Sequence, residues 1–268
     1  MAYDYDLPLL TDALGRVGVH AEVQMWDAPV DWSVYDLVVI RSTWDYVERR
    51  DEYLAWVDSV PRLANPSSVV RWNADKRYLG ELARRGVPIV PTIWPRDGQA
   101  IPSDWRDIVV KPAVSAGGRN TGRFSDAAAA TEFAKALLGG GHDVLVQRYV
   151  ASVDIIGEVG VFFFGGQVSH AIRKGAILER DAAPRPDASL AEGQRFAHLP
   201  LDQAPVAFAH GVLDALGVTP LYARVDCVRD DAGTDIVIEV ELNEPYLFLE
   251  TDPPAADRFA AAVLDWLS

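Results

Sequence analysis

Apolar and polar residues alternate regularly near the end of the chain, in the stretch IVIEVELN from Ile236 to Asn243. Because side chains alternate between faces along a β-strand, this pattern predicts a strand with one polar and one apolar face. The polar face carries Glu239, Glu241 and Asn243, and the apolar face carries Ile238, Val240 and Leu242. A half-exposed strand whose polar face meets water is the simplest interpretation of the alternation alone.

The preceding stretch, LYARVDCV, has the same period and is joined to the first by the turn sequence RDDAGTD, which predicts an antiparallel hairpin. Arg224 and Asp226 then share a face and lie beside Glu239, Glu241 and Asn243. Carboxylates this close repel one another and need a counter-cation. Oxygen ligands of the Asp, Glu and Asn type suit Mg²⁺. An ion-pair network around Arg224 is the alternative explanation.

Hydrophobic periodicity predicts further helices and strands in an α/β and α+β arrangement. Helices are expected over 7–17, 53–60, from a cap at Asn73 to Gly86 with Leu79, Leu82 and Ala83 inside, from a cap at Ser125 to about 139, and over 204–216 and 255–267. Strands are expected over 21–25, 37–40, 107–112 and 143–150, and on both sides of the turn at Gly165 and Gly166. Residues 181–194 are expected to form a long mobile loop.

Two lysines occupy positions that favour an anion. Lys76 is expected in the first turn of the helix after Asn73, where a cation is unfavourable against the helix dipole unless an anion is near. Lys111 ends a strand and leads into AVSAGGRNTG, where Ser115, Gly117 and Gly118 can form a flexible phosphate-binding loop. A solvated lysine and an ordinary hairpin turn are the corresponding alternatives.

Composition excludes several classes of function. The net charge of -14 argues against nucleic-acid and anionic-membrane partners. Cys227 is the only cysteine, so an internal disulfide and a cysteine-based zinc cluster are excluded, and we expect Cys227 to be a small buried apolar residue on a strand. An acidic N-terminus and the lack of a long apolar run predict a cytoplasmic protein.

A series of short motifs resembles the ATP-grasp superfamily, in the order those enzymes show: DK at Asp75, VVKP with SAGG, VQRY, GEVGVFF, ARVD and EVELNEP. Within it, RSTWDY, RWNADKRYL, SHAIRK and EVELNEPYLFL are most similar to the ligase-like proteins grouped with the ATP-grasp enzyme of D-cycloserine biosynthesis. The resemblance covers most of the chain. It implies a Rossmann-like α/β domain (1–72), a central subdomain (73–146) and a C-terminal subdomain with the metal site (147–268), which enclose ATP.

The resemblance also implies roles for individual residues. The phosphates of ATP would be held by Lys76, Lys111 and the loop of Ser115, Gly117 and Gly118; the adenine by Gln147, Arg148, Tyr149 and Val150; and the ribose by Glu158. Lys174 and Arg224 would be catalytic, and Asp226, Glu241 and Asn243, with Glu239 as a competing ligand, would hold two Mg²⁺ ions. Arg41, Trp44, Asp45 and Tyr46, at the end of a predicted strand, are candidates for binding the substrate, with a purely structural strand end as the alternative.

The sequence departs from the family pattern at three places. Pro245 follows Asn243 by two residues instead of three, so either Glu239 or Glu241 can bridge the metals. After SHAIRK the chain reads GAILERDAAPRPD where the cycloserine-type proteins carry a G-D-F-R-V-Q-like run, so D-cycloserine synthesis does not follow from the resemblance. The first strand and glycine turn of such domains are also missing, so we expect either a start farther upstream or a first sheet that is one strand smaller.

The resulting prediction is an ATP-dependent ligase that joins a small-molecule carboxylate to an amine through an acyl phosphate. A carboxylate kinase of the same fold, and a catalytically silent nucleotide-binding regulatory protein, are the alternatives. The presence of both lysines together with the predicted metal ligands argues against the silent binder. A homodimer is left open.

Overall fold

A computed structural model describes residues 4–95, 100–185 and 195–268. The helices are α1 (Asp6–Arg16), α2 (Arg50–Ser59), α3 (Ser67–Asn73), α4 (Tyr78–Arg84), α5 (Ala127–Gly139), α6 (Ser152–Ile156), α7 (Ala204–Ala215) and α8 (Ala255–Leu267), with short 3₁₀ helices η1 (Trp32–Val34), η2 (Trp44–Val47) and η4 (Leu249–Thr251). The strands are β1 (Val38–Val39), β2 (Leu63–Ala64), β3 (Thr92–Ile93), β4 (Ile108–Pro112), β5 (Gly122–Phe124), β6 (Val144–Arg148), β7 (Glu158–Phe164), β8 (Gln167–Lys174), β9 (Phe196–Leu199), β10 (Tyr222–Arg229) and β11 (Asp235–Glu241).

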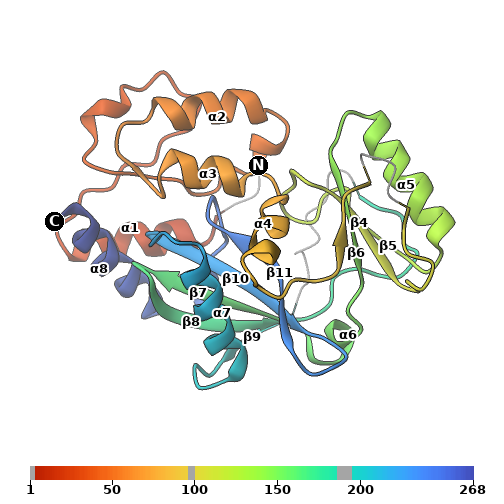
Figure 1. Ribbon diagram of the computed structural model, residues 1–268. Coiled ribbons are helices and arrows are strands. Elements are labelled where there is room, and N and C mark those ends of the chain that lie inside the picture. The colour runs from red at the N-terminus through yellow and green to blue at the C-terminus, as the bar shows by residue number, and fades with distance from the viewer. Residues whose placement is uncertain (1–3, 96–99, 186–194) are drawn as a thin grey trace.

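An antiparallel five-stranded sheet, in the order β11-β10-β7-β8-β9, forms the centre of the molecule (Figure 1). Val161 and Phe163 of β7 face α4 and α7 on one side of this sheet. Their neighbours Phe162 and Phe164 face α1 and α8 on the other. The alternation of these buried side chains is the reason the GEVGVFFF stretch forms a strand covered on both faces.

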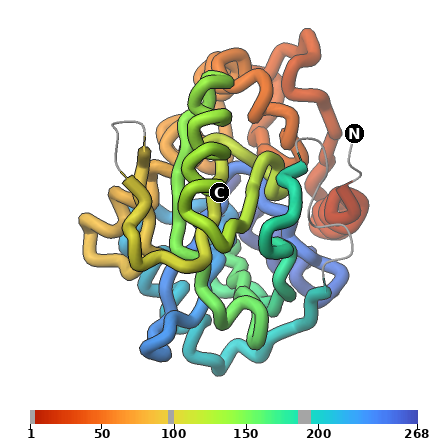
Figure 2. Tube along the Cα trace, turned by 90° about the vertical axis from the view of Figure 1, so that its right-hand side faces the viewer, coloured from red at the N-terminus to blue at the C-terminus, as the bar shows by residue number. Residues whose placement is uncertain are grey.

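A second antiparallel sheet, in the order β3-β6-β4-β5, lies beside the first and is covered by α5 (Figure 1). Figure 2, viewed from this side, shows α5 in front of the rest of the molecule. Ile108, Val110 and Val146 pack against Ala130 and Ala134 of α5 in a core of their own. This sheet carries Lys111 and Gln147 and holds them opposite the five-stranded sheet.

The N-terminal region is divided between two cores. β1 and β2 form a parallel two-stranded sheet, and Trp26, Tyr46 and Tyr53 gather beside it in an aromatic core. In contrast, α1 packs along α8 at the opposite end of the chain (Figure 1). The first helix therefore shares its hydrophobic core with the C-terminal sheet, and residues 1–72 are not packed as an isolated unit.

Most predicted elements are confirmed, with local differences. The strand predicted over residues 21–25 is wrong, because this segment makes no ladder in the structure. Asp126 caps α5, with its carboxylate accepting from the Ala129 amide at 3.0 Å, whereas Ser125 donates to Asp181. Ala83, predicted inside, is exposed. Cys227 is buried on β10 as predicted.

The predicted loop 181–194 falls partly outside the described residues, which end at 185 and resume at 195. In its described part, the Asp181 amide donates to the Arg123 carbonyl at 2.8 Å, and the Asn120 amide donates to the Arg185 carbonyl at 2.9 Å. This part of the segment therefore lies along β5. Within the described ranges, none of the helices has the length and apolar composition of a membrane-spanning segment.

Candidate functional site

The hairpin of β10 and β11 brings the predicted acidic face together. Arg224 lies opposite Glu241, and Asp226 lies opposite Glu239. A β-bulge between this pair and the Cys227–Val237 pair inserts Ile238 as an extra residue. Ile238 consequently packs near Val150 rather than beside Val240 and Leu242, so its predicted face is wrong. The carboxylates nevertheless share one face, as predicted.

This acidic face occupies one end of the sheet surface that α8 covers at the other end. Tyr222 and Phe162 pack beneath α8, whereas Arg224 and Asp226, farther along β10, remain uncovered by it. Gly160 of β7 lies next to Asp226, and a Cβ there would come within 2.9 Å of an Asp226 carboxylate oxygen. Glycine at this position therefore leaves the space that the charged side chains need.

The outer edge of β11 is held by residues that the sequence did not single out as functional. Asn73 donates to the Val240 carbonyl and accepts from the Leu242 amide, both at 2.7 Å, and the Tyr78 hydroxyl accepts from the Val240 amide at 2.9 Å. Asn73 is the last residue of α3 rather than the cap of a following helix, so that prediction is wrong. Satisfying these edge groups fixes the backbone on which Glu241 and Asn243 stand.

Each carboxylate of the face already has a cationic neighbour. Arg224 donates to both oxygens of Asp226 at 3.0–3.1 Å and also to Glu241. Lys174 pairs with Glu158 and lies 3.0 Å from Asp226. The catalytic candidates Arg224 and Lys174 are therefore in direct contact with the candidate metal and ribose ligands.

Lys76 approaches the acidic face from the opposite side. It lies 3.1 Å from Glu239 and donates to the backbone carbonyl of Ser115 at 2.7 Å. It is buried between α3 and α4, so the prediction of a first-turn position is wrong, and so is the alternative of a solvated surface lysine. Gly117 and Gly118 follow Ser115 with φ of 63° and 73°, a conformation that favours glycine.

The electrostatics divide the two candidate glutamates. Burial would raise the pKa of Glu239, but Lys76, Lys111 and Arg224 hold it at about 2. Burial raises the pKa of Glu241 to about 7, with Arg224 opposing and the charges of Glu239 and Asp226 adding to the rise. Of these two glutamates, Glu241 is therefore the one whose ionised form an added cation would stabilise more.

The side chain of Asn243 provides further support for a Mg²⁺ site beside Glu241. Both side-chain atoms of Asn243, the amide oxygen and nitrogen, are buried without a hydrogen-bond partner. An amide oxygen left in this way beside Glu241 is a suitable ligand for a hard cation. In the described part of the chain no three Asp, Glu, His or Cys side chains are gathered closely enough to hold a metal. Mg²⁺ is compatible with this, because it commonly takes one or two carboxylates plus substrate phosphates.

The predicted adenine-binding segment, residues 147–150, begins in the last two residues of β6. Gln147 is buried and donates to the Thr92 hydroxyl at 3.1 Å, and Val150 joins the apolar cluster with Ile236. Arg148 points outward and pairs with Asp231, and the Tyr149 hydroxyl donates to Asp154 at 2.6 Å. Gln147 and Val150 therefore point inward, whereas the side chains of Arg148 and Tyr149 bind other residues, Asp231 and Asp154.

The candidate substrate residues Arg41, Trp44, Asp45 and Tyr46 have different surroundings in the structure. The guanidinium group of Arg41 is buried 3.5 Å from Asp6 and 3.8 Å from Asp4, yet none of its nitrogens makes a hydrogen bond. Asp45 accepts from the Trp26 indole at 3.2 Å, and Tyr46 belongs to the aromatic core. The Trp44 indole donates to the Glu244 carbonyl at 3.3 Å and so links η2 to the loop after β11.

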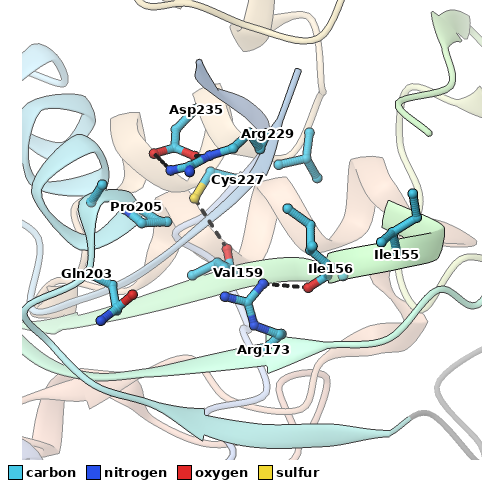
Figure 3. A pocket seen from close by; sticks show the side chains of 12 residues that line it. Ile155, Ile156, Val159, Arg173, Gln203, Pro205, Cys227, Arg229 and Asp235 are labelled. Atoms are coloured by element: carbon cyan, nitrogen blue, oxygen red, sulfur yellow. Dashed lines mark hydrogen bonds and ion pairs between the residues drawn. The ribbon is translucent and has the colours of Figure 1, made fainter. Parts of the chain in front are cut away.

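A cavity of about 430 Å³ lies on the opposite face of the five-stranded sheet, beside α7 (Figure 3). Its lining includes Cys227, Val159 and Arg173, whose guanidinium donates to the Ile156 carbonyl (Figure 3). These residues alternate with Asp226, Glu158 and Lys174 along their strands and therefore point away from the acidic face. The cavity is not part of the candidate site.

Comparison with known proteins identifies the family of the chain. A family model described as the N-terminal domain of D-cycloserine synthetase DcsG matches residues 1–65. The cycloserine biosynthesis protein DcsG of Streptomyces lavendulae is 39% identical, over 98% of this chain and 94% of that protein. The chain belongs to the D-cycloserine synthetase family. The predicted family is thereby confirmed.

Solved structures agree. The crystal structure of D-cycloserine synthetase DcsG matches with a TM-score of 0.88 at 38% identity, covering 99% of this chain and 95% of that chain. The ATP-grasp ligase PsnB, in a complex with a minimal precursor variant, Mg and ADP, matches at 0.66 with 14% identity, covering 99% and 96%. D-alanine–D-alanine ligase from Bacillus anthracis matches at 0.60 with 14% identity, covering 99% and 93%. The ATP-grasp fold is confirmed.

Proposed function

We propose that this member of the D-cycloserine synthetase family activates a small-molecule carboxylate with ATP and joins it to an amine, with Mg²⁺ held by Asp226, Glu241 and Asn243. The observation that carries the proposal is the unpartnered Asn243 amide beside the charge-crowded Glu241. Because Glu239 already pairs with Lys76, Glu241 is the glutamate that would hold Mg²⁺ beside Asn243. The proposed domain boundaries are after residues 72 and 146, and α1 packs in the C-terminal core.

The chain's own cations supply the phosphate site. Lys76 and Lys111 are both buried, and burial lowers the pKa of Lys111 although the charge of Glu239 opposes this effect. Lys174 is anchored by Asp226 and Glu158, so it can shift from Glu158 to a γ-phosphate without leaving the site. Gln147, with the backbone of Arg148, Tyr149 and Val150, would line the adenine, and Glu158 would receive the ribose hydroxyls.

The reaction follows from positions and charges. A substrate carboxylate oxygen attacks the γ-phosphorus, the bond from that phosphorus to ADP breaks, and an acyl phosphate forms. The amine nitrogen then attacks the acyl carbon, and phosphate leaves. Lys174 and Arg224 neutralise charge that develops on the transferred group, and bound Mg²⁺ would add to that neutralisation. The loop at Gly117 and Gly118 can exclude water, which would hydrolyse the acyl phosphate.

ADP release over a panel of small carboxylates and amino acids, with and without a second amine, tests the proposal. We expect Mg²⁺-dependent release that requires a carboxylate, with amide product only when an amine is present. Release without any amine-dependent product would instead favour the carboxylate kinase. ATP binding with no stimulated release would favour the silent nucleotide-binding protein.

A further inference from the structure

Arg123, on β5, is the centre of a charged cluster that none of the roles proposed above uses. The residue is only 5% exposed. Its guanidinium donates to both oxygens of Asp107 at 2.8–2.9 Å and to both oxygens of Asp154 at 2.8–3.0 Å. Two such bidentate pairs are geometrically specific, so they fix the relative positions of β5, the start of β4 and α6.

The same cluster holds the adenine-binding segment, residues 147–150. The Arg123 guanidinium lies over the ring of Tyr149, 3.4 Å from its centroid, which is within the range of a cation–π contact. The Tyr149 hydroxyl donates to Asp154 at 2.6 Å, and the Tyr149 amide donates to the Asp107 carbonyl at 2.8 Å. Arg123 and its two carboxylate partners therefore all contact Tyr149, and they fix the backbone that would line the adenine.

Arg123 also contacts the segment that follows β8, residues 178–185, which we call the docked segment. Its guanidinium donates to the Leu178 carbonyl at 3.3 Å. Asp181 of this segment accepts from the Ser125 amide at 2.8 Å and from the Ser125 hydroxyl at 2.6 Å. The docked segment belongs to the C-terminal subdomain in sequence but lies along β5 of the central subdomain. One buried side chain thus bonds to both.

We infer that Arg123 is a positioning residue that couples nucleotide binding to the docked segment, by fixing Tyr149 on one side and Leu178 on the other. A nucleotide that orders residues 147–150 then strengthens docking, and docking strengthens nucleotide binding by the same factor. This inference rests on the proposed function, because it needs a nucleotide at the adenine-binding segment. An ion-pair cluster that served stability alone would not respond to the nucleotide.

Arg123→Lys tests the coupling, because lysine keeps the charge but cannot form the two bidentate pairs. We expect the Kd for Mg-ADP, measured by calorimetry, to rise about 10-fold, within the usual range for coupling between two sites. Trypsin cleavage after Arg180 reports on docking, since this side chain is 56% exposed within the docked segment. Mg-ADP should slow that cleavage about 10-fold in the wild type and less than about twofold in the variant.

Asp181→Gly tests the coupling from the other side, at an exposed position that does not contact Tyr149. Its φ of 59° suits glycine, and the change removes both bonds to Ser125. We expect the Kd for Mg-ADP to rise about 3- to 10-fold. Glu179→Gly is the matched control, because it adds backbone freedom to the same segment at an exposed side chain with no bond among the described residues. Its Kd should stay within about twofold of the wild-type value.

Two results would overturn the inference: an unchanged Kd for Mg-ADP in Asp181→Gly, and equal protection of the docked segment by Mg-ADP in the wild type and Arg123→Lys. If Arg123→Lys does not fold, Asp181→Gly and its control decide. Coupling in a protein that releases no ADP with any substrate would count against the proposed ligase and support the inference. Failure of the wild type to bind Mg-ADP would overturn both.

Discussion

The carboxylate of Glu241 is shared between Arg224 and the centre of the acidic face, and this position predicts the effect of removing its charge. Glu241→Gln should reduce the rate of ADP release by at least about 100-fold, the range seen when one charge-stabilising group is removed from an active site. Little change in the free energy of unfolding is expected, because lost repulsion from Glu239 and Asp226 offsets the lost pair with Arg224.

Steady-state ADP release and urea unfolding, measured on the same protein, check both parts. Glu132→Gln, on the exposed surface of α5, is the control for glutamate substitution. Full activity combined with a large loss of stability would show that Glu241 serves an ion-pair network rather than catalysis.

His170 predicts a pH dependence of stability. Its ring stacks on Phe162 with centroids 4.2 Å apart, and one ring nitrogen donates to the Leu247 carbonyl at 2.7 Å. Burial lowers its pKa to about 4. The folded pKa lies below the ordinary value, so stability is complete above about pH 6.5 and is lost as the pH falls toward 4. At about 1.4 kcal/mol per unit, the contribution is about 3 kcal/mol.

Urea unfolding at pH 7.5 and pH 4.5, for the wild type and His170→Phe, isolates this contribution. The wild type should lose about 2–3 kcal/mol more than the variant between the two pH values, since all other titrating groups are common to both. Equal losses in the two proteins would contradict a neutral, buried His170.

At the scale of elements, Asn73 connects α3 to the edge of β11. Asn73→Ala would leave the Val240 carbonyl and the Leu242 amide unpaired, and we expect it to lower the free energy of unfolding by about 2–4 kcal/mol. The rate of ADP release should fall as well, because Glu241 lies between these two residues. Arg71→Ala, an exposed position on the same helix, should have a small effect on both. A stable but inactive Asn73→Ala protein would show that Asn73 does not hold the strand.

The elements that the sequence predicts well are those decided locally. The hairpin of β10 and β11, with Arg224 and Asp226 beside the glutamates, follows from a period of two and a turn sequence. The bulge at Ile238 does not follow, because it is set by contacts of the strand edge with Asn73 and residues 88–90, far away in sequence. Asn73 is of a residue type that often caps helices, and only the tertiary structure shows that its side chain bonds to the edge of β11.

The same limit applies to the site. The candidate residues Lys76, Lys111, Asp226, Glu241 and Asn243 could be named from the sequence because motif order and strand period point to them. The buried Glu244 Oε2 without a hydrogen-bond partner was not predictable, because it depends on how the loop after β11 packs, and Trp44 from another part of the chain contacts that loop. The outward position of Arg148 likewise depends on a contact with Asp231.

At the scale of the whole molecule, the two ends of the chain stabilise one core. Leu10 of α1 is 2% exposed and lies in the cluster that contains Phe259 of α8. Leu10→Ala should cost about 2–5 kcal/mol and lower the midpoint of one cooperative transition. Arg16→Ala, which removes an exposed ion pair between the same helices, should cost about 1 kcal/mol or less. A separate early transition in thermal unfolding of Leu10→Ala would show that the N-terminal region unfolds independently.

In the proposed mechanism the γ-phosphoryl group of ATP is transferred to a substrate carboxylate. To follow this transfer, a carboxylate that stimulates ADP release is labelled with ¹⁸O in both oxygens, and the released phosphate is analysed by mass spectrometry. Acyl-phosphate formation predicts one ¹⁸O atom in each phosphate released during coupling to the amine. Phosphate without ¹⁸O, formed at the same rate as ADP, would show that no acyl phosphate forms.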